Sequence, residues 1–160
     1  MQFRTIDPEK DRETILKFRR DSFQISFGTD EDFDEQKYMG WIRAKVKDFP
    51  DGLVLAILND HIIGQLELTI RVDSGKRLGY INLIYLIPEL RGFGLGELLH
   101  QYAMRFFREH DLQNYQLRVS TTNQQAIAFY EKSGMKQMKM EIDGKVIRMR
   151  GEVLTETKKG

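Results

Sequence analysis

The feature that most constrains the fold is a glycine-rich turn between two segments of opposite character. Before the turn, residues 80–87 (YINLIYLI) form an almost continuous apolar run, which is typical of a central strand covered on both faces. After the turn, from about residue 94 to residue 109, apolar side chains recur at helical spacing. The linking sequence, PELRGFGLG, holds three alternating glycines and one arginine. A strand, a tight turn and a helix in this order predict an α/β layered unit.

The rest of the chain adds strands and helices in a mixed order. We expect a helix that begins near Pro8 and runs to about Ser22, a second one ended by Pro50, and a third from residue 123 to Gly134. Further strands are expected at residues 2–6, 53–58, 61–72, 115–120, 135–142 and 145–153. The fold class is therefore α/β (α+β layered), with a mixed, mostly antiparallel central sheet of about seven strands flanked by four helices. We expect one domain over residues 1–152 and a frayed tail over residues 153–160.

Composition excludes several classes of protein and partner. Lys and Arg number 25 against 24 Asp and Glu, so the net charge of +1 creates no global field for nucleic acid. Cysteine is absent, which removes disulfides, thiolate metal sites and cysteine nucleophiles. The charged amino terminus lacks the apolar stretch of a signal peptide, and no later apolar run reaches membrane-spanning length. We expect a cytoplasmic protein with no metal and no membrane or nucleic-acid partner.

The glycine turn is suited to holding a phosphate or pyrophosphate. Several N–H groups at a helix start lack internal partners, the helix dipole is positive there, and Arg91 adds a formal charge. The alternative is a turn that merely joins a strand to a helix. No Gly-Lys-Ser/Thr follows, which excludes a P-loop, and Glu97 and Leu99 stand where a Gly-x-Gly-x-x-Gly fingerprint would need its last glycine.

Two blocks of sequence resemble one known family. Residues 91–96 (RGFGLG) resemble the Arg/Gln-x-x-Gly-x-Gly/Ala signature of the GNAT superfamily of N-acetyltransferases. Residues 123–135 (NQQAIAFYEKSGM) are similar to that family's Asn-x-x-Ala-x-x-Phe-Tyr-x-x-x-Gly-Phe, with Met135 in place of the usual aromatic residue. The two blocks cover roughly residues 79–136 and stand in the right order and structural context. The chain is therefore identified as resembling an acetyl-CoA-dependent N-acetyltransferase.

The resemblance implies roles for particular residues. The strand before the turn would splay from its neighbour, and the pantetheine arm of acetyl-CoA would bond to the backbone of Leu86 and Ile87, with an N–H near Leu86 serving the oxyanion. Asn123 would contact the cofactor, cap its helix, or do both. Tyr130 would protonate the departing thiolate, although a helical Tyr is more often a packing residue. The pyrophosphate would rest on the amides of the turn, which are those of Arg91, Gly92, Phe93, Gly94, Leu95 and Gly96.

The implied reaction is direct attack of a neutral amine on the acetyl thioester, which suits a chain without cysteine. A general base is harder to assign, because the run YINLIYLI has no Asp, Glu or His, although many relatives carry a carboxylate there. Glu67 could act through a water, or it could be an ordinary exposed strand residue. Tyr80 and Tyr85 are further candidates. We interpret His61, His100 and His110 as surface residues.

The acceptor is an amine of a small molecule or peptide that the sequence does not identify. In the family, the first two helices form one wall of the acceptor pocket, and the acidic residues there would suit a cationic amine such as a polyamine, an aminoglycoside or a lysine side chain. We favour the alternative, that this acidic loop is solvated and caps the next helix. Aromatic residues nearby (Phe27, Phe33 and Trp41) would line an apolar pocket or belong to the core. The acidic residues are Asp30, Glu31, Asp32, Asp34 and Glu35.

Two other functions fit parts of the sequence. One is a non-catalytic acyl-CoA-binding sensor module. The presence of Tyr130 argues against this function. The other is an interaction domain without a ligand, which leaves the agreement between the two blocks unexplained. We expect a monomer or homodimer, since a carboxy-terminal hairpin offers strand edges that can pair between protomers.

Overall fold

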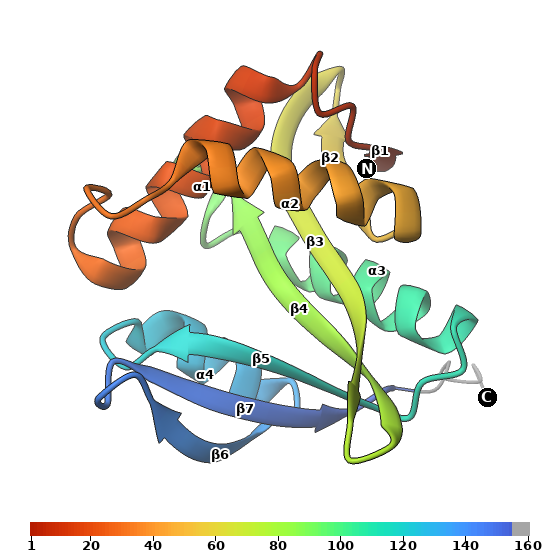
Figure 1. Ribbon diagram of the computed structural model, residues 1–160, viewed down its shortest axis with the longest axis vertical. Coiled ribbons are helices and arrows are strands. Elements are labelled where there is room, and N and C mark those ends of the chain that lie inside the picture. The colour runs from red at the N-terminus through yellow and green to blue at the C-terminus, as the bar shows by residue number, and fades with distance from the viewer. Residues whose placement is uncertain (155–160) are drawn as a thin grey trace.

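A computed structural model describes residues 1–154. Within them a seven-stranded sheet has the order β1-β2-β3-β4-β5-β7-β6, and four helices pack on it (Figure 1). Neighbouring strands are antiparallel except for β4 and β5, so the predicted fold class is confirmed. The strands are β1 (Gln2–Thr5), β2 (Leu53–Leu58), β3 (His61–Asp73), β4 (Lys76–Leu86), β5 (Asn114–Ser120), β6 (Lys136–Glu141) and β7 (Val146–Glu152), and the helices are α1 (Arg12–Phe27), α2 (Glu35–Asp48), α3 (Leu95–Glu109) and α4 (Gln124–Lys132).

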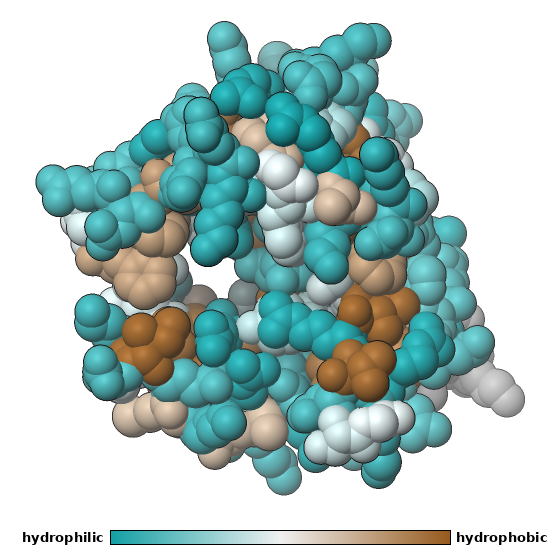
Figure 2. Space-filling model, viewed as in Figure 1, coloured by the Kyte–Doolittle hydropathy of each residue, from teal (hydrophilic) through white to brown (hydrophobic). Residues whose placement is uncertain are grey.

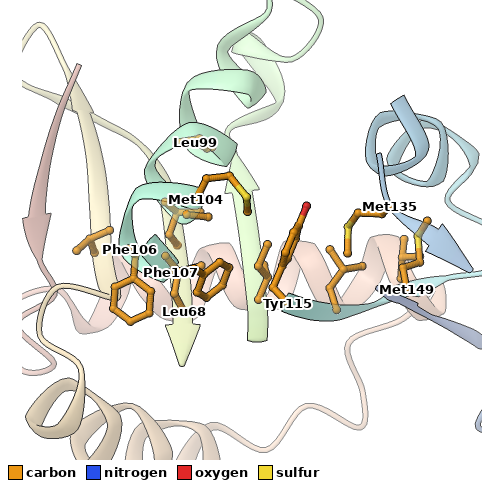
Figure 3. Close-up of a cluster of buried hydrophobic side chains, with 14 of the residues drawn as sticks. Leu68, Leu99, Met104, Phe106, Phe107, Tyr115, Met135 and Met149 are labelled. Atoms are coloured by element: carbon orange, nitrogen blue, oxygen red, sulfur yellow. The ribbon is translucent and has the colours of Figure 1, made fainter. Parts of the chain in front are cut away.

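The helices bury both faces of the sheet in separate clusters. On one face, α3 and α4 pack on β3, β5 and β7 through a large core, part of which Figure 3 shows around Leu99, Phe107, Tyr115 and Met149. On the other face, α1 and α2 pack on β2 through a smaller core that includes Ile15 and Ile42. On this second face, α1 and α2 therefore cover the half of the sheet that the amino-terminal strands form.

The first helix differs from its predicted bounds at both ends. It begins at Arg12 rather than near Pro8, and the Asp11 side chain does not cap it. The Asp11 carboxylate instead accepts hydrogen bonds from Arg4 and from the Asp7 backbone N–H. The helix continues past Ser22 to Phe27, because the first residue suited to end it is Gly28, which has a left-handed φ of 77°.

The parallel strands β4 and β5 separate soon after they meet. They pair only from Gly79 to Ile81 of β4, opposite residues 115–117, although β4 continues to Leu86 and β5 to Ser120. A register shift between β3 and β4 places an extra residue, Asn82, at the point where the separation begins. This is the splay between central strands that the family resemblance implies, and it leaves room for a cleft.

The carboxy-terminal end of the described chain is held by hydrogen bonds. The Val153 backbone N–H donates to the Gln113 carbonyl, and Arg108 donates to the Leu154 carbonyl. The rest of the predicted tail, residues 155–160, lies outside the described residues. No helix within residues 1–154 combines the length and apolar character needed to cross a membrane.

Candidate functional site

The cleft between β4 and β5 consists of three adjoining sections that share lining residues. The turn section lies at the glycine turn and has a volume of about 400 Å³. It meets the central section at Ser26, Ile84 and Tyr130, and the central section meets the third, which we call the arginine section, at Arg118. Figure 2 shows an opening on this face, between α1 and the strands β5 and β7 as they lie in Figure 1.

At the glycine turn itself, the turn section presents backbone rather than side chains. Gly92 and Gly94 have φ values of 87° and 80°, a left-handed conformation that favours glycine, and a side chain added at either position would meet nothing within 4 Å. Helix α3 begins directly after Gly94, and no side chain caps it. The free N–H groups and positive dipole of this helix start adjoin open space, which is the arrangement that binds anions.

The structure brings most of the predicted cofactor-binding residues to this section, but not all of them. Leu86, Arg91, Gly92, Gly94, Gly96, Asn123 and Tyr130 line it. Ile87 does not line it, and its N–H is bonded to the Ile63 carbonyl on β3. Phe93 is 76% exposed and does not line the section, and Leu95 packs against the core instead. The contacts of these residues with a cofactor stay predictions.

Arg91 makes contacts that the sequence gave no reason to expect. Its Nε donates to the Leu86 carbonyl, and its Nη2 lies 3.2 Å from the Asp21 carboxylate on α1. Asp21 also accepts a hydrogen bond of 2.6 Å from the Tyr85 hydroxyl, and burial together with this bond raises the pKa of Tyr85. Our sequence analysis missed Asp21. The available signal was its place three residues after Phe18, on the helix face that packs on the sheet.

Tyr130 and Asn123 both line the turn and central sections. Within residues 1–154 the Tyr130 hydroxyl makes no hydrogen bond, and burial raises its pKa to about 12, so it remains a proton donor at neutral pH. The Asn123 side chain accepts a hydrogen bond of 3.1 Å from the Ala126 N–H and so caps α4. The capping interpretation of Asn123 is therefore confirmed.

Glu67 is enclosed behind the cleft rather than exposed. Its side chain is fully buried, and its Oε2 accepts hydrogen bonds from the Tyr38 hydroxyl (2.5 Å) and the Gln65 amide (2.8 Å). Its Oε1 accepts no hydrogen bond from any residue that the structure describes and lies 3.8 Å from Nη1 of Arg19. Burial, and then the charge of Glu67, raise the pKa of Tyr38. Arg19 lines the central section, whereas Glu67 lines none of the three sections.

The acidic loop is occupied with local structure. Asp30 and Glu35 both pair with Arg20, and Asp34 caps α2 by accepting from the Lys37 N–H. The predicted acidic residues (Asp30, Glu31, Asp32, Asp34 and Glu35) do not line any section of the cleft. The structure therefore supports the capping interpretation of this loop.

One histidine prediction is wrong. His100 is buried, and its Nε2 lies 3.0 Å from the Tyr115 hydroxyl, while burial lowers the pKa of its imidazole. The buried surface of α3 is wider than the apolar face expected from the sequence, because α4 also packs on this helix through Phe129. His61 is exposed, and His110 bonds to Asp51. Within residues 1–154, no three His, Asp or Glu side chains are grouped so as to hold a metal ion.

Comparison with known proteins identifies the family. A family model described as "Acetyltransferase (GNAT) family" matches residues 12–135, and the chain belongs to this family. Mycothiol acetyltransferase from Streptomyces griseus is 28% identical over 135 residues, which are 82% of this chain and 41% of that protein. The chain thus spans about two fifths of the length of this curated relative.

Solved structures agree on the fold. Naa20 from Chaetomium thermophilum, in complex with a bisubstrate analogue, matches with a TM-score of 0.77 and 21% identity over 96% of this chain and 87% of that one. The PaiA N-acetyltransferase from Thermoplasma acidophilum, in complex with coenzyme A, matches with a TM-score of 0.70 and 22% identity over 94% and 98% of the two chains.

Proposed function

We propose that this protein transfers the acetyl group of acetyl-CoA to a primary amine of a small molecule or peptide. The observation that carries the proposal is the cleft between β4 and β5, which joins an uncapped, glycine-lined helix start to a tyrosine hydroxyl with no partner among the described residues. Coenzyme A has a pyrophosphate and a thiol, which are the two groups that these features suit. The coenzyme A bound to a structural neighbour supports this choice of cofactor.

The backbone of β4 provides a donor for the oxyanion. Because the Ile87 N–H faces β3, the alternation of strand amides directs the N–H of Leu86 toward the gap that faces β5. Attack of the amine nitrogen on the thioester carbonyl forms the C–N bond and places negative charge on the carbonyl oxygen. A hydrogen bond from Leu86 would stabilise that charge until the C–S bond breaks.

Tyr130 would assist the leaving thiolate as a hydrogen-bond donor. A thiol, with an ordinary pKa of about 8.5, is a stronger acid than a phenol whose pKa is raised to about 12. Complete proton transfer from Tyr130 to the thiolate is therefore unfavourable at equilibrium. The hydroxyl instead stabilises the sulfur while its charge develops, and the proton that yields free coenzyme A comes ultimately from the attacking amine.

Two carboxylates are candidates for receiving the amine proton. The predicted base, Glu67, is enclosed by Tyr38 and Gln65 and does not line the cleft. Asp21 is one-third exposed and hydrogen-bonded to Tyr85, which lines the turn section. We therefore favour Asp21, acting through Tyr85 or a water, over Glu67 as the proton acceptor.

The test is a pair of measurements on the purified protein. Calorimetric titration of acetyl-CoA measures binding, and release of the coenzyme A thiol measures turnover with a panel of amines. We expect saturable binding and amine-dependent thiol release. Binding without turnover of any amine would favour the acyl-CoA sensor instead, and absence of binding would refute both functions.

A further inference from the structure

Three arginines from three strands meet at the end of the cleft farthest from the glycine turn. Arg118 on β5 and Arg148 on β7 stand directly opposite one another in the antiparallel ladder, so their side chains share one face of the sheet. Arg71 on β3 lies over the ring of Tyr80, with its Cζ 3.3 Å from the ring centroid, and the Arg148 guanidinium lies 5.9 Å from the same ring. We call Arg71, Arg118 and Arg148 the arginine cluster.

The cluster has too few carboxylates to neutralise it. Glu141 accepts hydrogen bonds from both Arg118 (3.0 Å) and Arg148 (2.9 Å), and these contacts, first that of Arg148, lower the pKa of Glu141 to about 2. Within residues 1–154, Arg71 forms no ion pair, and its Nη2 donates a hydrogen bond of 3.3 Å to the Asn82 side chain. Desolvation, and then the positive charges of Arg148 and Arg118, lower the pKa of Arg71. Three positive charges thus face one negative charge.

Two members of the cluster form the wall of the cleft. Arg71 and Arg118 line the arginine section together with Arg19, Tyr80 and Asn82, whereas Arg148 does not line it and donates to the Gln116 side chain. Arg118 and Arg19 also line the central section, which reaches Tyr130. Like charges placed together at the wall of a cavity are unfavourable unless an anion enters between them. Guanidinium groups are suited to this role, because their donors match carboxylate and phosphate oxygens.

We propose that the arginine section binds an anionic group, a carboxylate or a phosphate, carried by the same molecule whose amine is acetylated. The proposal rests on the proposed acetyltransferase function and gives its acceptor a chemical class, an amine that also carries an acid. It differs from the cationic acceptor considered from the acidic loop, whose carboxylates are paired elsewhere or lie outside the cleft.

The cleft holds both ends of such an acceptor in one continuous space. Arg118 and Ser120 on β5 line the central section that Tyr130 on α4 also lines, and Arg118 lines the arginine section as well. An amine beside Tyr130 and an acid at Arg118 can therefore belong to one molecule. A series of acids of increasing length measures the separation between the two groups.

The experiment compares acids with their uncharged counterparts. The carboxylate series is glycine, β-alanine, 4-aminobutyrate, 5-aminopentanoate and glutamate, each against its amide, with phosphoethanolamine against ethanolamine as the phosphate arm and spermidine as a cationic amine. Two readouts are taken with saturating coenzyme A or acetyl-CoA, the shift in melting temperature on binding and the kcat/KM of acetylation. The variants are wild type, Arg71→Gln/Arg118→Gln, and the control Arg43→Gln, an exposed arginine paired with Glu9 on the outside of α2.

We expect at least one acid to be preferred over its counterpart by roughly ten- to a hundredfold in kcat/KM, with a matching stabilisation. The double arginine variant should lose this preference, while Arg43→Gln should keep it. The carboxylate and phosphate arms identify which anion is bound. The proposal would be overturned if no acid were preferred over its uncharged counterpart, or if the preference survived in the double variant. Turnover of amines without acid preference refutes the inference alone. Stabilisation by acids without any turnover shows an anion site but refutes the proposed function, and with it the acceptor role of that site.

Discussion

The glycine turn and the arginine section differ in the groups that they present to a ligand. The glycine turn presents backbone amides, whereas the arginine section presents side chains from separate strands. The turn section depends on the path of residues 91–96 and on the start of α3. The arginine section depends on the register that sets Arg118 opposite Arg148 and on the packing of Arg71 over Tyr80. A backbone site is disrupted mainly by filling its space, and a side-chain site can be adjusted one charge at a time. Under the proposed function, a change of acceptor would require new side chains at the arginine section and no change at the glycine turn.

Gly94→Asp should have the largest effect. The new carboxylate would enter the open space at the start of α3, where it repels the pyrophosphate and occupies the positive end of the helix. We expect the Kd of acetyl-CoA, measured by calorimetry, to rise at least about a hundredfold. Gly75→Asp is the matched control, because Gly75 has a similar φ of 79° and equally open surroundings in the β3–β4 turn. Equal weakening by both changes would contradict the assignment.

Tyr130→Phe should reduce the rate without reducing cofactor affinity. Removing the hydroxyl leaves the developing thiolate without its donor, so kcat should fall roughly a hundredfold while the Kd of acetyl-CoA stays within about threefold. Steady-state kinetics beside calorimetry separates the two effects. Tyr102→Phe serves as the control, since its hydroxyl donates to the Asp51 carbonyl outside the cleft. An unchanged kcat in Tyr130→Phe would remove Tyr130 from the mechanism.

Glu141→Gln should strengthen the arginine section. Glu141 competes with an entering anion for Arg118 and Arg148, so neutralising it should lower the KM for an acidic acceptor about threefold and leave that of its amide unchanged. The gain should shrink at high ionic strength, which screens exposed charges. A higher KM for the acid in Glu141→Gln would show that Glu141 holds the arginines in place rather than competing for them.

Glu67→Gln should have the smallest effect on rate. If Glu67 is structural, kcat should stay within about threefold of wild type, while Asp21→Asn should lower it tenfold or more. Loss of the charge beside Arg19 should still lower the free energy of unfolding by about 1–3 kcal/mol, measured by urea denaturation. The reverse ranking of the two kcat values would restore Glu67 as the base.

The same two regions show what sequence can predict. In the turn section, residues 91–96 are contiguous, and their glycines, arginine and flanking elements have local signals; the Asn123 cap is similarly local. The arginine cluster has no local signal, because Arg71, Arg118 and Arg148 meet only when β3, β5 and β7 take their places in the sheet.

Two of the failed predictions have a common physical cause. The sequence suggests an exposed strand residue at Glu67, but in the fold Tyr38 of α2 covers it. The sequence likewise suggests a surface residue at His100, but α4 packs beside α3 and buries it. Both burials depend on an element distant in sequence. The end of α1 was missed for another reason, since the helix continues to the first glycine that can end it.

The most direct test of the account is a crystal structure of the protein with coenzyme A and the N-acetylated form of its preferred acidic amine. We predict the pyrophosphate on the amides of residues 92–96, the thiol near the Tyr130 hydroxyl, and the acid between Arg71 and Arg118. A pyrophosphate bound away from the glycine turn, or an acid directed away from the arginine cluster, would contradict it.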